Sequence, residues 1–301
     1  MATRENLEAN ATRQMEAEKA KSNSEFFRVL RQLRKNKLAM LGLFIFLVEV
    51  LIAVLSTWIA PYDYTKMDLL NCFAKPSTEH FFGCDPMGRD IFSQIIVGAR
   101  FSLSIGVIAV ALSNVVGITI GAVAGFFGGW VDNLIMRILD IIQAIPNMLL
   151  MIVVSAMLGP GFFNTVIALS VGGIPGCARM LRAQMLKERG NEYIEACTSI
   201  NCSKFRIIFS HLLPNCLSPL IVSATMRMGH TITAAAGLSF IGIGVQPPAT
   251  EWGAMLSQSR EFMQQAPHLV LFPGIAIAIT VLALNLLGDG LRDALDPKLK
   301  N

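Results

Sequence analysis

Charged residues are scarce in this chain, where Asp, Glu, Lys and Arg make up 15% of the 301 residues. A soluble globular domain carries roughly 25%. Common catalytic and nucleotide-binding motifs are missing as well. The chain has no Gly-x-x-x-x-Gly-Lys-Ser/Thr phosphate loop, no His-Glu-x-x-His zinc motif and no Gly-x-Ser-x-Gly nucleophile elbow. These absences argue against a P-loop nucleotide hydrolase, an intramembrane metalloprotease of that type and an elbow-type serine hydrolase.

Apolar residues dominate instead, at 53% of the chain. A helix needs about 20 mostly apolar residues to cross a hydrocarbon core of ~30 Å. Six windows are long enough, and they predict an all-α polytopic membrane protein with six transmembrane helices. The predicted helices cover residues 38–60, 101–125, 134–158, 162–180, 217–236 and 269–287.

The distribution of Lys and Arg predicts the orientation of these helices. With the N-terminus inside, 18 basic residues fall on the cytoplasmic side and 5 on the opposite side. We therefore expect both termini and the connection 191–214 in the cytoplasm. The resulting division is a cytoplasmic N-terminal segment 1–37, a first helix 38–60, an extracytoplasmic segment 61–100, a core of five helices 101–287 and a cytoplasmic tail 288–301.

The N-terminal segment begins with polar residues, so we expect no cleavable signal peptide. From Ser24 onward the sequence predicts a basic amphipathic helix at the lipid interface. The alternative is a plain basic flank of the first transmembrane helix. The apolar side of this helix would be Phe26, Phe27, Leu30 and Leu33, opposite Arg28, Arg31, Arg34 and Lys35.

The connection 191–214, called here the corner segment, is the longest polar connection in the second half of the chain. Asn191 is placed to cap one short helix and Ser203 to cap a second. Asn201 stands between them, and Asn tolerates the left-handed conformation that a sharp corner requires. The second helix is predicted to stop before Pro214, because proline disfavours a helical residue in front of it. Its apolar stripe would be Phe205, Ile208, Phe209 and Leu212.

Within this segment, Glu195-Ala196, Asn201 and Leu213-Pro214 resemble the EAA motif of bacterial ABC-importer permeases. The family pattern has Ala where this chain has Cys197 and Gly where it has Asn201. Three further runs resemble the second permease of the dipeptide, oligopeptide and nickel branch. They begin at His80, Gly237 and Leu282 and read HFFGCDPMGRDIFSQIIVGARFSLSIG, GLSFIGIGVQPPATEWGAML and LALNLLGDGLRDALDPKLK.

The resemblance covers roughly residues 38–299 and implies a type I importer permease, a transport subunit rather than an enzyme. It also implies a second homologous permease subunit, two ABC ATPase subunits that bind ATP and Mg²⁺, and an extracytoplasmic substrate-binding protein. No cofactor of the chain itself, no metal site and no nucleic-acid partner is expected. The ATPase would contact Glu192, Glu195, Ala196, Asn201, Phe205, Ile208, Phe209, Leu213 and Pro214.

The substrate stays open, because permeases of this pattern serve dipeptides, longer peptides, nickel chelates and glutathione. Ionisable residues inside the predicted helices are candidates for the pathway: Glu49, Arg227 and His230. Such groups are costly in a membrane and face a partner or a cavity. Arg227 and His230 share one helix face, and either contact an anionic substrate group or pair with Glu49. Glu49 alternatively packs against a neighbouring helix. The rival function, a self-contained ion-coupled carrier or channel, would have only these three residues as ligands.

Small residues and prolines predict how the helices pack. Gly117, Gly121, Gly125 and Gly129 recur every four residues and predict close approach of another helix. Pro146 and Pro175 are expected to kink or loosen their helices. Cys72 and Cys84 both lie in the extracytoplasmic segment, where a disulfide is expected, whereas the other four cysteines should stay reduced. Arg89 and Asp90 are expected to pair with each other.

Overall fold

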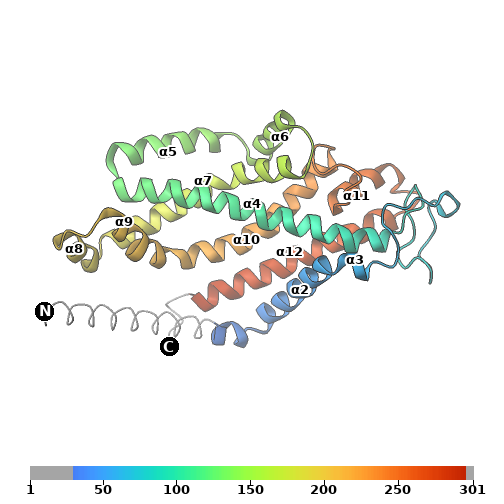
Figure 1. Cartoon of the computed structure of the whole chain (residues 1–301), viewed down its shortest axis with the longest axis horizontal. Coiled ribbons are helices and arrows are strands. Elements are labelled where there is room, and N and C mark those ends of the chain that lie inside the picture. The colour runs from blue at the N-terminus through green and yellow to red at the C-terminus, as the bar shows by residue number, and fades with distance from the viewer. Residues whose placement is uncertain (1–29, 296–301) are drawn as a thin grey trace, which may run out of the picture.

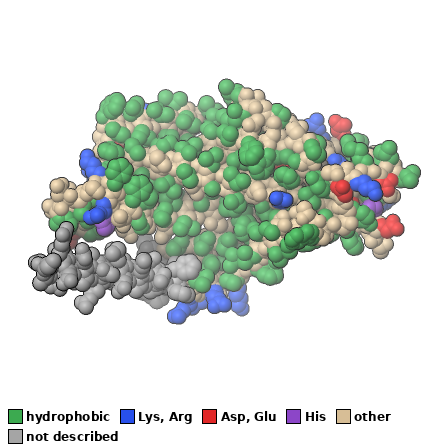
Figure 2. Space-filling model, in the orientation of Figure 1, with side chains coloured by type: hydrophobic (Ala, Val, Ile, Leu, Met, Phe, Trp, Pro, Cys, Tyr) green, Lys and Arg blue, Asp and Glu red, His purple; other side chains and the backbone are tan. Residues whose placement is uncertain are grey.

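The computed structural model describes residues 30–295. Within this range the chain contains helices and turns and no strand. The predicted apolar positions Phe26 and Phe27 lie outside the described residues. Apolar side chains cover the middle of the face seen in Figure 2, and charged side chains gather mainly toward its two ends. This distribution fits a protein whose middle is surrounded by lipid.

Five long helices run along the length of the molecule (Figure 1). Each is long and apolar enough to cross a membrane, and a bent helix pair supplies a sixth crossing if it is counted as one. The five are α2 (Lys37–Val54), α4 (Ile91–Phe127), α7 (Phe162–Arg189), α10 (Leu213–Phe240) and α12 (His268–Leu295), and the bent pair is α5 (Gly129–Ala144) with α6 (Asn147–Leu158).

Shorter elements occupy the connections between the long helices. Three of them, the helices α8 and α9 and the π-helical turn η2, form one end of the bundle. The others lie toward the opposite end (Figure 1). Their bounds are α3 (Ser56–Ile59), η1 (Leu69–Asn71), α8 (Glu192–Ser199), α9 (Lys204–Arg206), η2 (Ile207–Leu212), α11 (Trp252–Ser259) and η3 (Arg260–Phe262).

The third predicted helix is not continuous. α5 and α6 meet at an angle of 88° on either side of Ile145 and Pro146. Pro146 stands at the N-cap of α6 and has no N–H to donate, and Ile145 before it is extended. Pro175, by contrast, lies inside α7 without ending it. The expectation of a disrupted helix is therefore confirmed at Pro146, while α7 continues through Pro175.

α4 packs along α7 through the predicted glycine seam. A Cβ atom at Gly121 would lie 2.5 Å from the backbone oxygen of Ala178, so only glycine permits this distance between the helices. The same relation holds for two more pairs, Gly117 with Cys177 and Gly125 with Met185. Gly129 does not belong to the seam, because it opens α5 with a φ of +54° and nothing lies within 4 Å of its Cβ position.

α2 packs along α12 in a similar way. A Cβ at Gly42 would lie 2.5 Å from the Ala283 oxygen. Leu33, in the helical stretch 30–35, is buried in a cluster with residues of both helices. This end of the predicted amphipathic helix therefore packs on the bundle. The cluster consists of Leu33, Ala39, Leu287 and Ala294.

The segment between α3 and α4 folds into a turn around two buried carboxylates. Gly88 N donates to Asp85 O (2.9 Å), and Gly88 has a φ of +74°. Arg89 Nε pairs with Asp85 Oδ2 at 2.6 Å, while Asp90 Oδ1 lies 2.9 Å from His80 Nδ1. The expected Arg89–Asp90 pair is therefore wrong, since Arg89 pairs with Asp85 and Asp90 pairs with His80.

Cys72 and Cys84 are both free thiols in the structure, so the expected disulfide is not formed. Their chain segments are nevertheless neighbours, because Phe73 N donates to Asp85 O and Cys84 N donates to Ala74 O. Burial, followed by the nearby Asp90 and Asp85 carboxylates, raises the pKa of the Cys84 thiol to about 11. A thiol that stays protonated reacts poorly in disulfide exchange.

Candidate functional site

The corner segment caps one end of the bundle, opposite the turn segment around Asp85 and Asp90 (Figure 1). It consists of α8, a sharp corner, α9 and η2, and η2 passes directly into α10.

A Schellman motif makes the corner. Asn201 has a φ of +57°, as predicted for the left-handed residue. Its N–H donates to Thr198 O, and Cys202 N donates to Cys197 O, both at 3.0 Å. These two bonds satisfy carbonyls at the end of α8, which would otherwise lack partners. Beyond the corner, Ser203 Oγ accepts from Arg206 N at 3.4 Å, so the predicted second cap is also confirmed.

The start of α8 is tied to the long helices by side chains. Asn191 occupies the N-cap, but its amide does not cap the helix as expected; it donates to Glu188 Oε2 at 2.8 Å. Tyr193 OH donates to the same carboxylate at 2.9 Å and accepts from Asn215 Nδ2 at 3.2 Å. Burial and the bond to Glu188 raise the pKa of Tyr193. The network joins the ends of α7, α8 and α10.

The prediction that the second helix stops before Pro214 is wrong. Leu213 has helical φ and ψ of −59° and −46°, and helix continues from Lys204 to Phe240. Leu213 N donates to Ile208 O, five residues back, which is the π-helical pattern. The wider turn moves the preceding carbonyls out of the α register in which they would clash with the proline ring.

The π turn also divides the predicted apolar stripe. The side chains of Phe205 and Phe209 are 75% and 60% exposed, and their rings stack with centroids 6.3 Å apart. Ile208 is half-buried, and Leu212 is completely buried against the bundle. The predicted apolar stripe assumed α-helical spacing. A π-helical turn contains an extra residue, so the side chains after it point to a different face of the helix.

On α8, Glu192, Glu195 and Ala196 are exposed. Within residues 30–295, Glu195 forms no ion pair. Ile194, between them, is buried and fixes the helix on the core. Leu213 is half-buried and Pro214 exposed at the start of α10. The corner segment thus presents two exposed carboxylates, which form no ion pair within residues 30–295, and two stacked aromatic rings.

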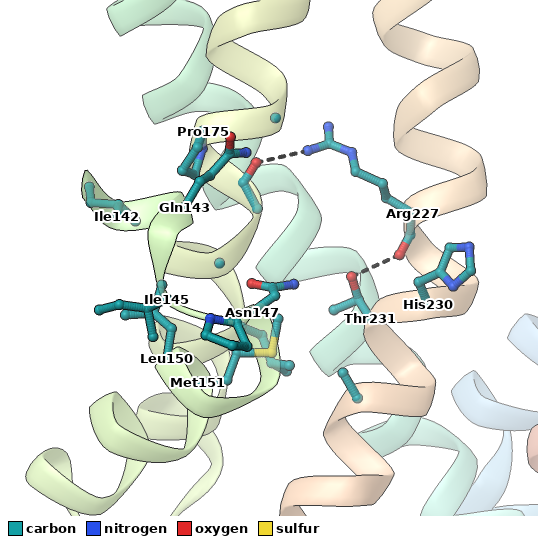
Figure 3. Close-up of a pocket in the computed structure, with 16 residues that line it drawn as sticks. Ile142, Gln143, Ile145, Asn147, Leu150, Met151, Pro175, Arg227, His230 and Thr231 are labelled. Atoms are coloured by element: carbon teal, nitrogen blue, oxygen red, sulfur yellow. Dashed lines mark hydrogen bonds between the residues drawn. The ribbon is translucent and has the colours of Figure 1, made fainter. Parts of the chain in front are cut away.

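Arg227 and His230 lie halfway along α10, far from the corner segment in the sequence. They border two cavities of about 440 and 480 Å³. Arg227 reaches across the first cavity, where Nη1 donates to Gly173 O of α7 at 3.1 Å (Figure 3). Nη2 donates to Asn114 Oδ1 of α4. Both acceptors are neutral.

Glu49 lies elsewhere, between α2 and α12. Thr280 Oγ1 donates to Glu49 Oε1 at 2.9 Å. The carboxyl group borders a separate apolar cavity that includes Phe44, Phe92 and Trp252. The expected pair of Glu49 with Arg227 or His230 is therefore wrong, and the alternative, packing against a neighbouring helix, is what the structure contains. Asn114 was not predicted from the sequence as the partner of Arg227, although a polar residue inside an apolar helix indicates such a role.

Comparison with known proteins places this arrangement in a family. Residues 117–301 match the family described as "Binding-protein-dependent transport system inner membrane component". The chain belongs to this family. Residues 24–76 match the "N-terminal TM domain of oligopeptide transport permease C". As a permease, the chain is a transport subunit of an ATP-driven ABC importer, and separate ATPase subunits hydrolyse the ATP.

Individual relatives agree with this assignment. A "Dipeptide transport system permease protein DppC" of Alkalihalophilus pseudofirmus is 46% identical over 90% of this chain and 89% of its own length. A "Glutathione transport system permease protein GsiD" of Escherichia coli O6:K15:H31 is 47% identical over the same shares. The permease therefore works with an ATPase and a substrate-binding protein as a multi-pass protein of the inner membrane.

Solved structures show the same fold. An inward-facing MetNI methionine ABC transporter matches with a TM-score of 0.56 at 20% identity, over 67% of this chain and 97% of that chain. An amino acid ABC transporter solved with histidines matches with a TM-score of 0.51 at 13% identity, over 66% and 92%. The type I importer permease fold is thus shared despite low identity.

Proposed function

We propose that this permease carries dipeptides or oligopeptides and forms one half of the translocation pathway, with a second homologous permease as the other half. The relatives named for dipeptide and glutathione transport support a peptide substrate. Two ATPase subunits would complete the assembly and hold ATP and Mg²⁺, with no cofactor on this chain. The excess of basic residues supports a cytoplasmic position for the termini and the corner segment.

The corner segment is the docking site for the ATPase in this proposal. The observation that carries it is the stacked, exposed pair Phe205 and Phe209 on a hydrogen-bonded corner at the bundle end. Exposed aromatic rings of this size mark interaction surfaces when they are contiguous. Lys204 and Arg206 beside them and Glu195 on α8 add charges that suit a protein groove better than lipid.

The continuity of helix from Lys204 to Phe240 supports a mechanical role. A displacement of the corner segment by the closing ATPase pair would pass along α10, which bears Arg227 and His230 at its middle. The Glu188–Tyr193–Asn215 network joins the same movement to α7. Two of the helices that border the first cavity, α7 and α10, would therefore move with the corner segment and open or close access to that cavity.

Glu195→Lys tests the docking claim. In proteoliposomes with all partner subunits, we expect peptide uptake to fall at least about tenfold, since a charged contact is reversed at the interface. ATP hydrolysis should no longer depend on the substrate-binding protein. Glu79→Lys is the control for ATPase association, because Glu79 is also exposed but belongs to the segment between α3 and α4. Normal uptake and normal ATPase association with Glu195→Lys would disprove the docking claim.

A further inference from the structure

The charged side chains that line the two cavities beside α10 are all basic. Arg227 and His230 border both, and Arg292 of α12 borders the second. Among the described residues that line either cavity, none is Asp or Glu. The remaining polar groups of the first cavity are neutral: Gln143, Asn147 and Thr231. The space is therefore lined by basic and neutral groups only.

Arg227 carries a positive charge that no carboxylate balances within residues 30–295. Its guanidinium donates to the Gly173 carbonyl and the Asn114 amide oxygen and also lies beside the Cys177 thiol. Its Nε is buried and has no partner in the structure. A guanidinium has five N–H donors, so unused donors remain for a further acceptor. A cation inside a membrane protein is costly without a counter-ion, and such residues generally line a substrate or ion path.

The break between α5 and α6 adds to the positive potential. α6 is a 12-residue helix whose first turn, at Pro146 and Asn147, lines the first cavity. Pro146 provides no side-chain cap, and the first N–H bonded inside the helix is that of Leu150, to Pro146 O. A helix N-terminus attracts anions through these free N–H groups. Gly172 of α7 lets Asn147 come this close, since a Cβ there would strike Asn147 Oδ1.

We propose that these cavities form an anion-binding station in the pathway, where Arg227 binds the terminal carboxylate of the peptide in transit. This inference rests on the proposed function, peptide import. The planar guanidinium fork matches a carboxylate, which is also the group that a dipeptide and glutathione have in common. Cavities of about 440 and 480 Å³ are in the range that holds a small organic ligand. His230 and Arg292 continue the basic lining along the second cavity.

Photolabelling of the purified complex, without the substrate-binding protein, tests the station directly. The probe is alanyl-p-benzoylphenylalanine, used as the free acid and as the C-terminal amide. We expect the acid to label α6, α7 or α10 about tenfold more than the amide, because only the acid offers a charged acceptor. Arg227→Gln should bring the ratio of acid to amide labelling to about one, and Arg227→Lys should keep part of the preference.

Arg137→Gln is the matched control, because Arg137 lies in α5, which borders the first cavity, but itself lines neither cavity. It should keep the full preference for the acid. Equal labelling by acid and amide in the wild-type complex would overturn the station, and this result needs no variant to fold. An unchanged preference in Arg227→Gln would overturn the role of Arg227. Labelling requires no ATP, so ATPase subunits that never co-purify would instead contradict the proposed function.

Discussion

Asn201 meets the strictest backbone requirement in the corner segment. Its φ of +57° is open to Gly and Asn but costs other residues roughly 1–2 kcal/mol. We therefore expect Asn201→Gly to keep the thermal midpoint of the purified permease, and Asn201→Val to lower it and to weaken ATPase binding. Ser199→Val, two residues earlier on the exposed side of α8, is the control for a β-branched side chain. Equal midpoints for Asn201→Val and Ser199→Val would contradict the rigid corner.

Cys84 should be unreactive at ordinary pH. With a pKa raised from 9.0 to about 11 by burial, roughly one thiol in a thousand is a thiolate at pH 8. Iodoacetamide alkylation, followed by mass spectrometry of the peptide, should accelerate about tenfold for each pH unit from 8 to 10. In the unfolded chain the reaction at pH 8 should be at least about a hundredfold faster. A rate at pH 8 that is the same for folded and unfolded protein would show that the thiol is not protected.

At the scale of elements, the contact of α4 with α7 depends on glycine. Gly121→Ala would place a methyl group 2.5 Å from the Ala178 oxygen, so we expect a loss of about 1–3 kcal/mol of stability. Thermal unfolding in detergent measures it. Gly274→Ala in α12 is the control, because nothing lies within 4 Å of that Cβ position and alanine favours helix. A Gly121→Ala protein as stable as Gly274→Ala would refute tight packing at the seam.

The sequence predicted elements well where hydrophobicity alone decides them. All the long helices fall within or around predicted spans, and α4 extends ten residues further back, to Ile91, because Asp90 caps it through Ser93 N at 2.7 Å. The local pattern of backbone hydrogen bonds could not be predicted as well from the sequence. The π turn before Pro214 leaves no mark in apolar periodicity, so both the end of the helix and the face of its stripe were mispredicted.

At the scale of the whole molecule, pairing between distant helices was the least predictable part. Helical spacing correctly put Arg227 and His230 beside the same cavities, since neighbours one turn apart share a face. The same spacing says nothing about which helices are adjacent. Glu49 therefore accepts a hydrogen bond from Thr280 and does not pair with a cation, because α2 packs along α12. Arg227 of α10 instead donates to residues of α4 and α7.

A photo-cross-linker in place of Phe209 tests most directly whether the corner segment contacts the ATPase. Phe209 is exposed at the bundle end, and Ile138, exposed on α5, is the control position. In membranes that contain the whole transporter, we expect position 209 to form a cross-link to a polypeptide with a Gly-x-x-x-x-Gly-Lys-Ser/Thr phosphate loop, identified by mass spectrometry. Position 138 should form none. No cross-link from position 209, or equal cross-links from both positions, would contradict ATPase docking at the corner segment.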